Sequence, residues 1–210
     1  MKIEIISVSA LSEGAEMLLT VGISDGVGRV EKRKILLFTE QYLEMGLCKG
    51  MHIPEDTLDT LEQMSKKCKA MKKGSELLSY SASSQTRLVQ RLCSKGIDRE
   101  SAREAAEQLE RLGAINERGD VERLVRSCLK KLWGKKRIYS DLCAKGYDRD
   151  IISAELENVD EDIFIENCRE LFIKKFKKMP QDPVDQKKII ASLTRYGYSF
   201  SEIKKAIQKQ

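Results

Sequence analysis

The chain contains few residues that interrupt helices or carry specialised chemistry. Its 210 residues include three prolines, one histidine and one tryptophan, and aromatic residues make up only 6%. Because no proline falls between Pro54 and Pro180, long helices are allowed over that whole range. Charged residues make up 34%, a share typical of amphipathic helices with charged surfaces rather than of a β-sandwich.

The chain also lacks long apolar runs. No stretch approaches the roughly 20 apolar residues that cross a bilayer, and the start "MKIEIISVSALSEG" does not have the layout of a secretory signal. We therefore expect a cytoplasmic protein without membrane association. In that reducing compartment, we interpret the cysteines as small buried apolar side chains. They are Cys48, Cys68, Cys93, Cys128, Cys143 and Cys168.

Motifs for catalysis or cofactor binding are absent. The cysteines form no Cys-x-x-Cys pair, and His52 has no recognisable nucleophile partner, so we expect neither a metal site nor a catalytic triad. There is no Walker-type loop and no HExxH. The stretch "GISDGVGRV", with Gly22, Gly26 and Gly28, has the wrong spacing for a dinucleotide fingerprint and predicts a hairpin turn. We expect no enzyme and no cofactor.

The first 53 residues differ from the rest. The runs "KIEIISVS", "AEMLLTVGIS" and "VEKRKILLF" are short and rich in β-branched residues, which predicts three antiparallel strands. The following "TEQYLEMG" predicts a short helix with Thr39 as its N-cap and Gly46 at its end. From Pro54 onward, apolar residues recur at steps of three and four, so the remainder is predicted to be helical.

One short phrase occurs three times in the helical part. "LCSKGIDR" begins at Leu92, "LCAKGYDR" begins at Leu142, and a degraded copy lies within "KIIASLTRYGYSFSEIKKAI". Each copy has a leucine four residues before a glycine that supplies the left-handed backbone of a helix end. These glycines are Gly96, Gly146 and Gly197.

A short polar residue after each glycine is the predicted N-cap of the next helix. These caps are Asp98, Asp148 and Ser199, and Ser199 with Glu202 has the spacing of a capping box. A further helix precedes each copy, so each repeat has three helices. We predict a mainly α fold in which a β-rich segment (1–53) precedes three repeats (54–113, 114–159 and 160–210). Such tandem arrays are elongated and curved, and they offer a long surface to a large partner.

These repeats resemble the RecX family of bacterial modulators of the RecA recombinase, from about Leu77 to Ile207. The resemblance is carried by "GAINE", by "RLVRSCLKKLWGKKRI" with Gly134 and Arg137, by "KGYDRDIISAEL" and by the closing "RYGYSFSEIKKAI". The chain departs from the family pattern at Asp120, where the family usually has an aromatic residue, and at Val121, which replaces an alanine.

The resemblance implies a non-enzymatic monomer that lies in the helical groove of a RecA filament on DNA, with DNA close by. It would modulate filament growth, ATP hydrolysis and strand exchange in recombination and DNA repair, with inhibition as the favoured direction. An acidic groove or DNA phosphate would attract the cation-rich stretches "RSCLKKLWGKKR" and "KKFKK". The candidate partner-binding residues are Arg126, Lys130, Lys131, Lys135, Lys136, Arg137, Lys145, Lys174, Lys175, Lys177 and Lys178.

Other interpretations remain open at this stage. The cations can be solvated helix faces, and Trp133 can be a partly buried aromatic at a helix end. Arg137 can support a structural ion pair instead of contacting a partner. The segment around "KGYDRD" superficially suggests a helix-turn-helix protein such as a transcriptional regulator. The acidic residues Asp148, Asp150, Glu155 and Glu157 would repel phosphate there. A repeat scaffold for another partner is a third alternative.

Overall fold

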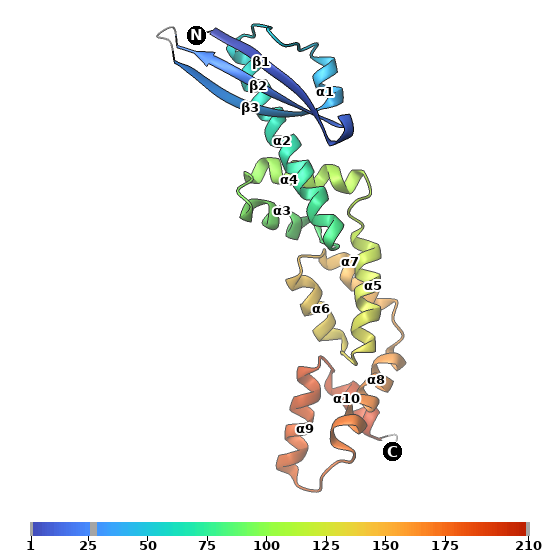
Figure 1. Ribbon diagram of the computed structural model, residues 1–210. Helices are drawn as coiled ribbons and strands as arrows, with labels where there is room; N and C mark the ends of the chain where they lie inside the picture. Colours follow the sequence, from blue (N-terminus) through green and yellow to red (C-terminus); the bar gives the residue numbers. More distant parts are fainter. Residues whose placement is uncertain (1, 26–28, 209–210) are drawn as a thin grey trace. The chain divides into compact units, whose positions relative to one another are not determined.

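The computed structural model describes residues 2–25 and 29–208, which divide into two compact units. The first unit comprises residues 1–81 and 88–114, and the second comprises residues 82–87 and 115–210. The described part is mainly helical, with a three-stranded antiparallel sheet near the N-terminus (Figure 1), as predicted.

The first unit contains the sheet, two helices that pack on it and helices that follow them in the chain. Its strands are β1 (Lys2–Leu11), β2 (Glu16–Ser24) and β3 (Val30–Phe38), in the order β1-β2-β3. Gly22 lies inside β2 rather than in the hairpin turn, while Gly26 and Gly28 lie outside the described residues. The helices are α1 (Thr39–Glu44), α2 (Glu55–Tyr80), α4 (Arg99–Arg111) and most of α3 (Gln85–Ser94), and the short 3-10 turn η1 is Ser12–Gly14.

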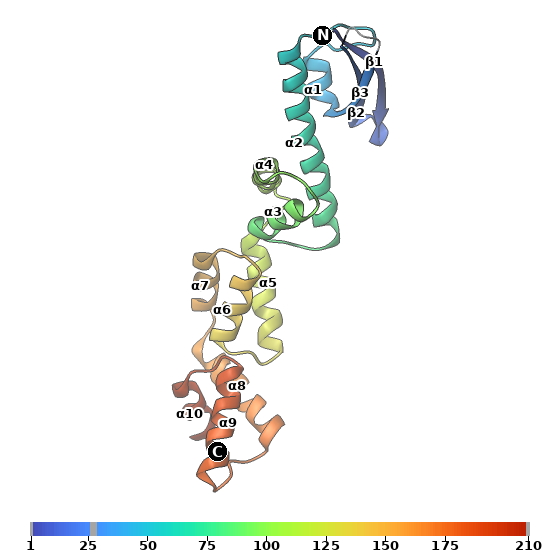
Figure 2. The same cartoon turned by 90° about the vertical axis from the view of Figure 1, so that its left-hand side faces the viewer.

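Alternate residues of the strands form an apolar face that α1 and the first half of α2 cover (Figures 1 and 2). Ile5, Leu19 and Leu37 are fully buried there with Leu61 of α2. The edge of β3 is tied to α2 by the Leu36 backbone N–H, which donates to Ser65 Oγ at 2.9 Å. The opposite helical face of α2 accommodates α4, and Gly74 leaves space for Leu109 of α4.

Besides Gly22, two further expectations for the first unit are wrong in detail. The N-cap of α1 is Phe38 rather than Thr39, and the Thr39 hydroxyl instead donates to the Gly14 carbonyl. Cys48 is exposed, because it lies in the irregular segment between α1 and α2 and not on the apolar face of a helix.

The other cysteines follow the expected pattern more closely. Cys68, Cys128 and Cys168 are buried, and Cys93 and Cys143 are half-buried. Burial raises the pKa of the Cys68 thiol to about 11 and that of Cys168 to about 12, mainly by desolvating the thiolate. These two thiols are therefore neutral packing groups at neutral pH.

The second unit contains two successive groups of three helices around one shared core. The helices are α5 (Glu117–Lys130), α6 (Lys135–Ala144), α7 (Arg149–Glu157), α8 (Glu161–Phe176), α9 (Pro183–Arg195) and α10 (Phe200–Gln208). Ile138 and Leu142 of α6 belong to the same buried cluster as Phe164, Phe172 and Tyr198. The two repeats of this unit therefore fold on each other.

The repeated glycines have the left-handed conformation that was predicted. Their φ angles are 85° at Gly96, 80° at Gly146 and 97° at Gly197. Each predicted cap also forms. The carboxylates of Asp98 and Asp148 accept the backbone N–H groups at the start of α4 and α7. At α10, Ser199 and Glu202 bond reciprocally, with the Glu202 N–H donating to Ser199 Oγ and the Ser199 N–H donating to the Glu202 carboxylate.

Two of these glycine turns pack against the first residues of a helix that comes earlier in the chain. We call the contact between the Gly146 turn and Ser84–Arg87 the first junction, and the contact between the Gly197 turn and Gly134–Arg137 the second junction. Both junctions lie within the second unit. In the first junction, Ser84 Oγ donates to the Lys145 carbonyl at 2.9 Å and accepts the Arg87 N–H. In the second, the two backbones are in direct contact.

Candidate partner-binding surface

The turn between α5 and α6 carries the densest group of predicted partner-binding cations. Its backbone is unusual because Leu132 has a φ of 56°, a left-handed conformation that a leucine rarely adopts. Such a residue costs on the order of 1 to 3 kcal/mol unless its surroundings hold it. Here the surroundings are the Gly197 turn of the third repeat.

Three hydrogen bonds connect the two turns. The buried Tyr198 hydroxyl donates to the Leu132 carbonyl at 2.9 Å, the Gly134 N–H donates to the Tyr196 carbonyl at 2.8 Å, and the Lys136 N–H donates to the Gly197 carbonyl at 3.2 Å. A Cβ atom on Gly134 would lie 2.4 Å from the Gly197 carbonyl carbon. Only glycine at position 134 allows this approach.

The close approach stacks cations and aromatic rings from both turns. The Arg137 guanidinium lies 4.0 Å from the ring centre of Trp133 and 5.0 Å from that of Tyr196. Lys175 Nζ lies 4.1 Å from the Tyr196 ring centre, and Lys131 Nζ lies 5.5 Å from that of Trp133. These distances are within the range of cation-π attraction. We call these five residues the cation-aromatic ladder.

The ladder cations are not neutralised by the chain. Within residues 2–25 and 29–208, no carboxylate forms an ion pair with Lys131, Arg137 or Lys175. A hydrogen bond from Lys175, together with the nearby charges of Lys175 and Arg137, lowers the pKa of the Tyr196 hydroxyl. This direction indicates a local environment that favours negative charge. Arg137 is therefore held by ring stacking, which leaves its N–H groups available for an anion.

Lys135 and Lys136 lie beside the ladder, exposed in the first turn of α6. Cations at a helix N-terminus face the positive end of the helix dipole, which costs roughly 0.3 to 1 kcal/mol each. Both line a cavity of about 380 Å³ between α6 and α7, whose other lining residues include Tyr139 and Leu156. The positive charge of the turn thus extends to an adjacent hollow that also contains one carboxylate, that of Glu157.

The other predicted cations separate into two groups. Arg126 pairs with Glu122 one turn earlier on α5, and Lys145 pairs with Asp141 at 2.7 Å. Their charges are partly compensated inside the chain. The remaining predicted cations are exposed and lie at the ends of two helices: Lys130 on α5, Lys174 on α8, and Lys177 and Lys178 directly after α8.

Tyr196 and Tyr198 are the residues of this surface that the sequence did not identify. Trp133 was interpreted as a partly buried aromatic and is indeed half-buried, but its ring also lies against Arg137 and Lys131. The two tyrosines flank Gly197, so the signal lay in the repeat itself. The turn of the third copy is "RYGYS", with an aromatic residue on each side of the glycine.

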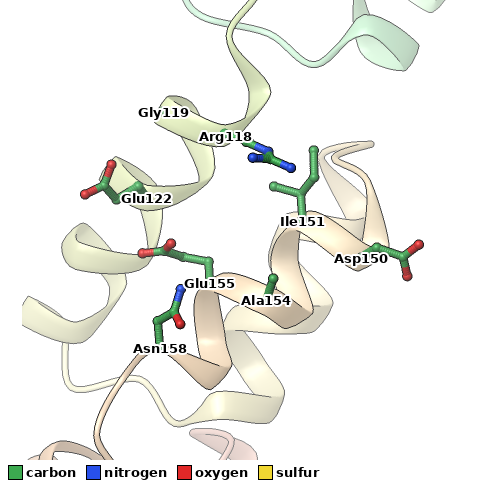
Figure 3. Close-up of a pocket in the computed structure, with 8 residues that line it drawn as sticks. All are labelled: Arg118, Gly119, Glu122, Asp150, Ile151, Ala154, Glu155 and Asn158. Atoms are coloured by element: carbon green, nitrogen blue, oxygen red, sulfur yellow. The ribbon is translucent and has the colours of Figure 1, made fainter.

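A cleft of opposite charge lies between α5 and α7, with a volume of about 460 Å³ (Figure 3). Its charged residues are Glu122, Asp150, Glu155 and Arg118. Figure 3 shows the Glu155 carboxylate extending toward α5 and the Arg118 guanidinium pointing toward Ile151. Glu155 of α7 therefore faces a different groove from the basic turn, whereas Glu157 of α7 lines the hollow that contains Lys135 and Lys136.

Comparison with known proteins decides which family this arrangement matches. Residues 161–207 match the family model described as RecX, third three-helix domain. The predicted resemblance to the RecX family is confirmed. The RecX match covers α8, α9 and most of α10, and thus the third repeat, which supplies Lys175, Tyr196 and Tyr198 to the surface.

Curated relatives and solved structures carry the same name. The chain is 25% identical over 184 residues to the regulatory protein RecX of Clostridioides difficile (strain 630), covering 85% of each chain. It is 28% identical over 119 residues to the regulatory protein RecX of Clostridium botulinum (strain Alaska E43 / Type E3), covering 55% of this chain and 56% of that one.

Solved RecX structures share the fold. A crystal structure of regulatory protein RecX superposes with a TM-score of 0.78 at 18% identity, over 99% of this chain and 100% of the other. The crystal structure of RecX from Lactobacillus salivarius gives a TM-score of 0.61 at 24% identity, over 69% and 96% of the two chains. Among the described helices, none is long and apolar enough to span a membrane.

Proposed function

We propose that this protein regulates recombination by binding the RecA-DNA filament in its helical groove, without catalysing a reaction. Bound there, it restrains filament growth, ATP hydrolysis and strand exchange. The observation that carries the proposal is the cation-aromatic ladder, since it presents fixed, unpaired positive charge to a partner. The RecX names of the relatives support the regulatory role.

The repeats support this proposal physically. We propose functional repeats over 54–113, 114–159 and 160–210 that form an elongated, curved monomer able to contact successive subunits of a filament. Several weak contacts distributed along such a partner add up through avidity. Small-angle scattering on the full chain tests this shape, and the profile of a sphere would contradict it.

A non-enzymatic role fits the chemistry of the site. The ladder consists of cations and rings, and it contains no pair of nucleophile and general base. The one histidine, His52, is exposed, and its backbone pairs with Glu4 at the edge of the sheet. Binding and release of the filament in the cytoplasm therefore account for the proposed activity.

The alternative is a protein that acts on DNA directly, for example as a transcriptional regulator. The ladder favours it to the extent that stacked arginine and aromatic rings also bind nucleic acid. The acidic cleft argues against the helix-turn-helix form, because α7 would be the recognition helix and carries Asp150, Glu155 and Glu157.

One experiment separates these two functions. Binding of the full chain is measured to single-stranded DNA alone and to the same DNA coated with RecA and ATP, while RecA ATP turnover is followed. Filament regulation predicts much tighter binding to the coated DNA and a fall in ATP turnover. Equal affinity for both forms of DNA would favour the direct DNA-binding function and contradict the proposal.

A charge-reversal variant tests the surface. The triple substitution Lys135→Glu, Lys136→Glu and Arg137→Glu should weaken filament binding while far-UV circular dichroism stays unchanged. The matched control makes the same charge change on exposed cations of the first unit: Lys32→Glu, Lys34→Glu and Lys69→Glu. If the first variant bound the filament as well as the parent protein, the basic turn would not be the contact.

A further inference from the structure

The third repeat contributes more to the surface than its own cations. Its Gly197 turn provides one hydrogen-bond donor and two acceptors to the basic turn of the second repeat. The donor is the hydroxyl of Tyr198, a fully buried side chain. Its acceptor is the carbonyl of Leu132, the residue with the left-handed backbone.

Leu132 directs the residues that follow it. Because its φ is positive, the chain reverses direction directly after α5 and brings Trp133 over Arg137 at 4.0 Å. A leucine without tertiary support favours negative φ, which would turn Trp133 and the start of α6 elsewhere. The Tyr198 hydrogen bond is thus made to the one residue whose conformation sets the ladder.

We infer that Tyr198 is a positioning residue, through which the third repeat sets the anion-binding geometry of the second. The inference rests on the proposed function, and it assigns the filament contact to a composite surface that neither the second nor the third repeat forms alone. The ligand class is an anion, either phosphate or carboxylate, held by Arg137 and Lys175, which both lie against the Tyr196 ring.

The second repeat offers a matched control. Tyr147 follows Gly146 as Tyr198 follows Gly197, and it too is buried. No hydrogen bond to the Tyr147 hydroxyl is found among the described residues, whereas Tyr198 makes one at 2.9 Å. Both substitutions remove one hydroxyl from a buried tyrosine that follows a repeat glycine, and only Tyr198→Phe also removes the hydrogen bond to Leu132.

The test uses the full chain with Tyr198→Phe or Tyr147→Phe. Trp133 is the single tryptophan, so its fluorescence reports the basic turn directly. For Tyr198→Phe we expect unchanged far-UV circular dichroism, a shifted Trp133 emission maximum and weaker quenching by iodide relative to neutral acrylamide, because the cations no longer surround the ring. We expect filament affinity to fall about fivefold, the value of one hydrogen bond. Tyr147→Phe should match the parent in all of these measurements.

Each outcome decides the inference. Parental Trp133 fluorescence and affinity in Tyr198→Phe would overturn it, as would equal effects of the two substitutions. A loss of helicity in Tyr198→Phe would also overturn it, since Tyr198 would then support the whole fold instead of the turn. If the parent protein does not bind the filament, the proposed function fails, while the fluorescence comparison still tests the positioning role.

Discussion

The two junctions of the second unit have the same glycine turn on one side and different partners on the other. In the first junction, the Ser84 side chain fills the space, and a Cβ on Gly146 would lie 3.0 Å from Ser84 Oγ. In the second junction, Gly134 has no side chain, and a Cβ atom on Gly197 would lie 2.4 Å from the backbone nitrogen of Arg137. A repeat can thus keep its turn while the partner sequence determines how close the backbones come.

This difference in distance accompanies a difference in chemistry. The residue before Gly146 is Lys145, which pairs with Asp141, while the residue before Gly197 is Tyr196, which stacks on Arg137. The ladder therefore forms only where the close approach and the aromatic residues coincide. A tandem array can in this way keep one junction for structure and use the other for binding.

The largest predicted effect is the loss of stability when the repeat glycines are replaced, and its size should differ among the three. Gly197→Ala should destabilise the second unit by about 3 to 5 kcal/mol, because positive-φ strain adds to a steric clash with backbone atoms. Gly96→Ala should cost only about 1 to 2 kcal/mol, the strain alone, since a Cβ there meets nothing within 4 Å among the described residues. Gly146→Ala should fall between them. Urea unfolding followed by circular dichroism gives the order, and a larger loss at Gly96 would contradict it.

The second prediction gives the second junction the residue type that the first junction has at Ser84. Gly134→Ser introduces a side chain where the second junction has none, and it should cost about 1 to 3 kcal/mol by overpacking against the Gly197 carbonyl. Trp133 fluorescence during urea unfolding measures this loss. Unchanged stability would mean that the backbones are not in contact at this position.

A smaller effect is expected in the first junction. Ser84→Ala removes both the donor to the Lys145 carbonyl and the acceptor of the Arg87 N–H, and should cost about 0.5 to 2 kcal/mol as a lost cap. Filament binding should stay at the parental level, because the ladder is not touched. A loss of affinity in this variant would show that the two junctions are not functionally separate.

The smallest effect concerns the two tyrosines beside Gly197. The cations lower the pKa of Tyr196, and burial raises that of Tyr198. Because the folded state favours neutral Tyr198, its contribution to stability is complete below the ordinary tyrosine pKa of about 10 and is lost as pH rises above it. Phenolate absorbance should show Tyr196 ionising first and Tyr198 last, with Tyr196→Phe and Tyr198→Phe assigning the steps. The reverse order would contradict the assigned environments.

Local signals made most of the fold predictable. The glycine and cap positions follow from backbone chemistry within a few residues, and so Gly96, Asp98 and Ser199 behave as the sequence indicates. The strands are equally local, because a run of β-branched residues between turns has few alternatives. Thr39 was misplaced by one residue, a change that depends on its tertiary bond to Gly14.

The site was only partly predictable. Its cations are dense enough in the sequence to be noticed, but charge alone does not distinguish Arg137, which stacks on two rings, from Arg126, which pairs with Glu122. The ladder depends on a contact between residues 134 and 197, and on a positive φ at Leu132. No propensity assigns that conformation to a leucine, so tertiary structure was needed to find it.

The role of the cation-aromatic ladder in filament binding is tested by measuring the filament affinities of Arg137→Ala and Arg126→Ala side by side. Each substitution removes one arginine, and the sequence alone placed both arginines in the same group of candidate partner-binding cations. Only Arg137 belongs to the ladder, whereas Arg126 pairs with Glu122. We expect filament affinity to fall at least roughly tenfold for Arg137→Ala, the size expected of a hot-spot residue, and to change less than about twofold for Arg126→Ala. Equal losses, or a larger loss for Arg126→Ala, would contradict it.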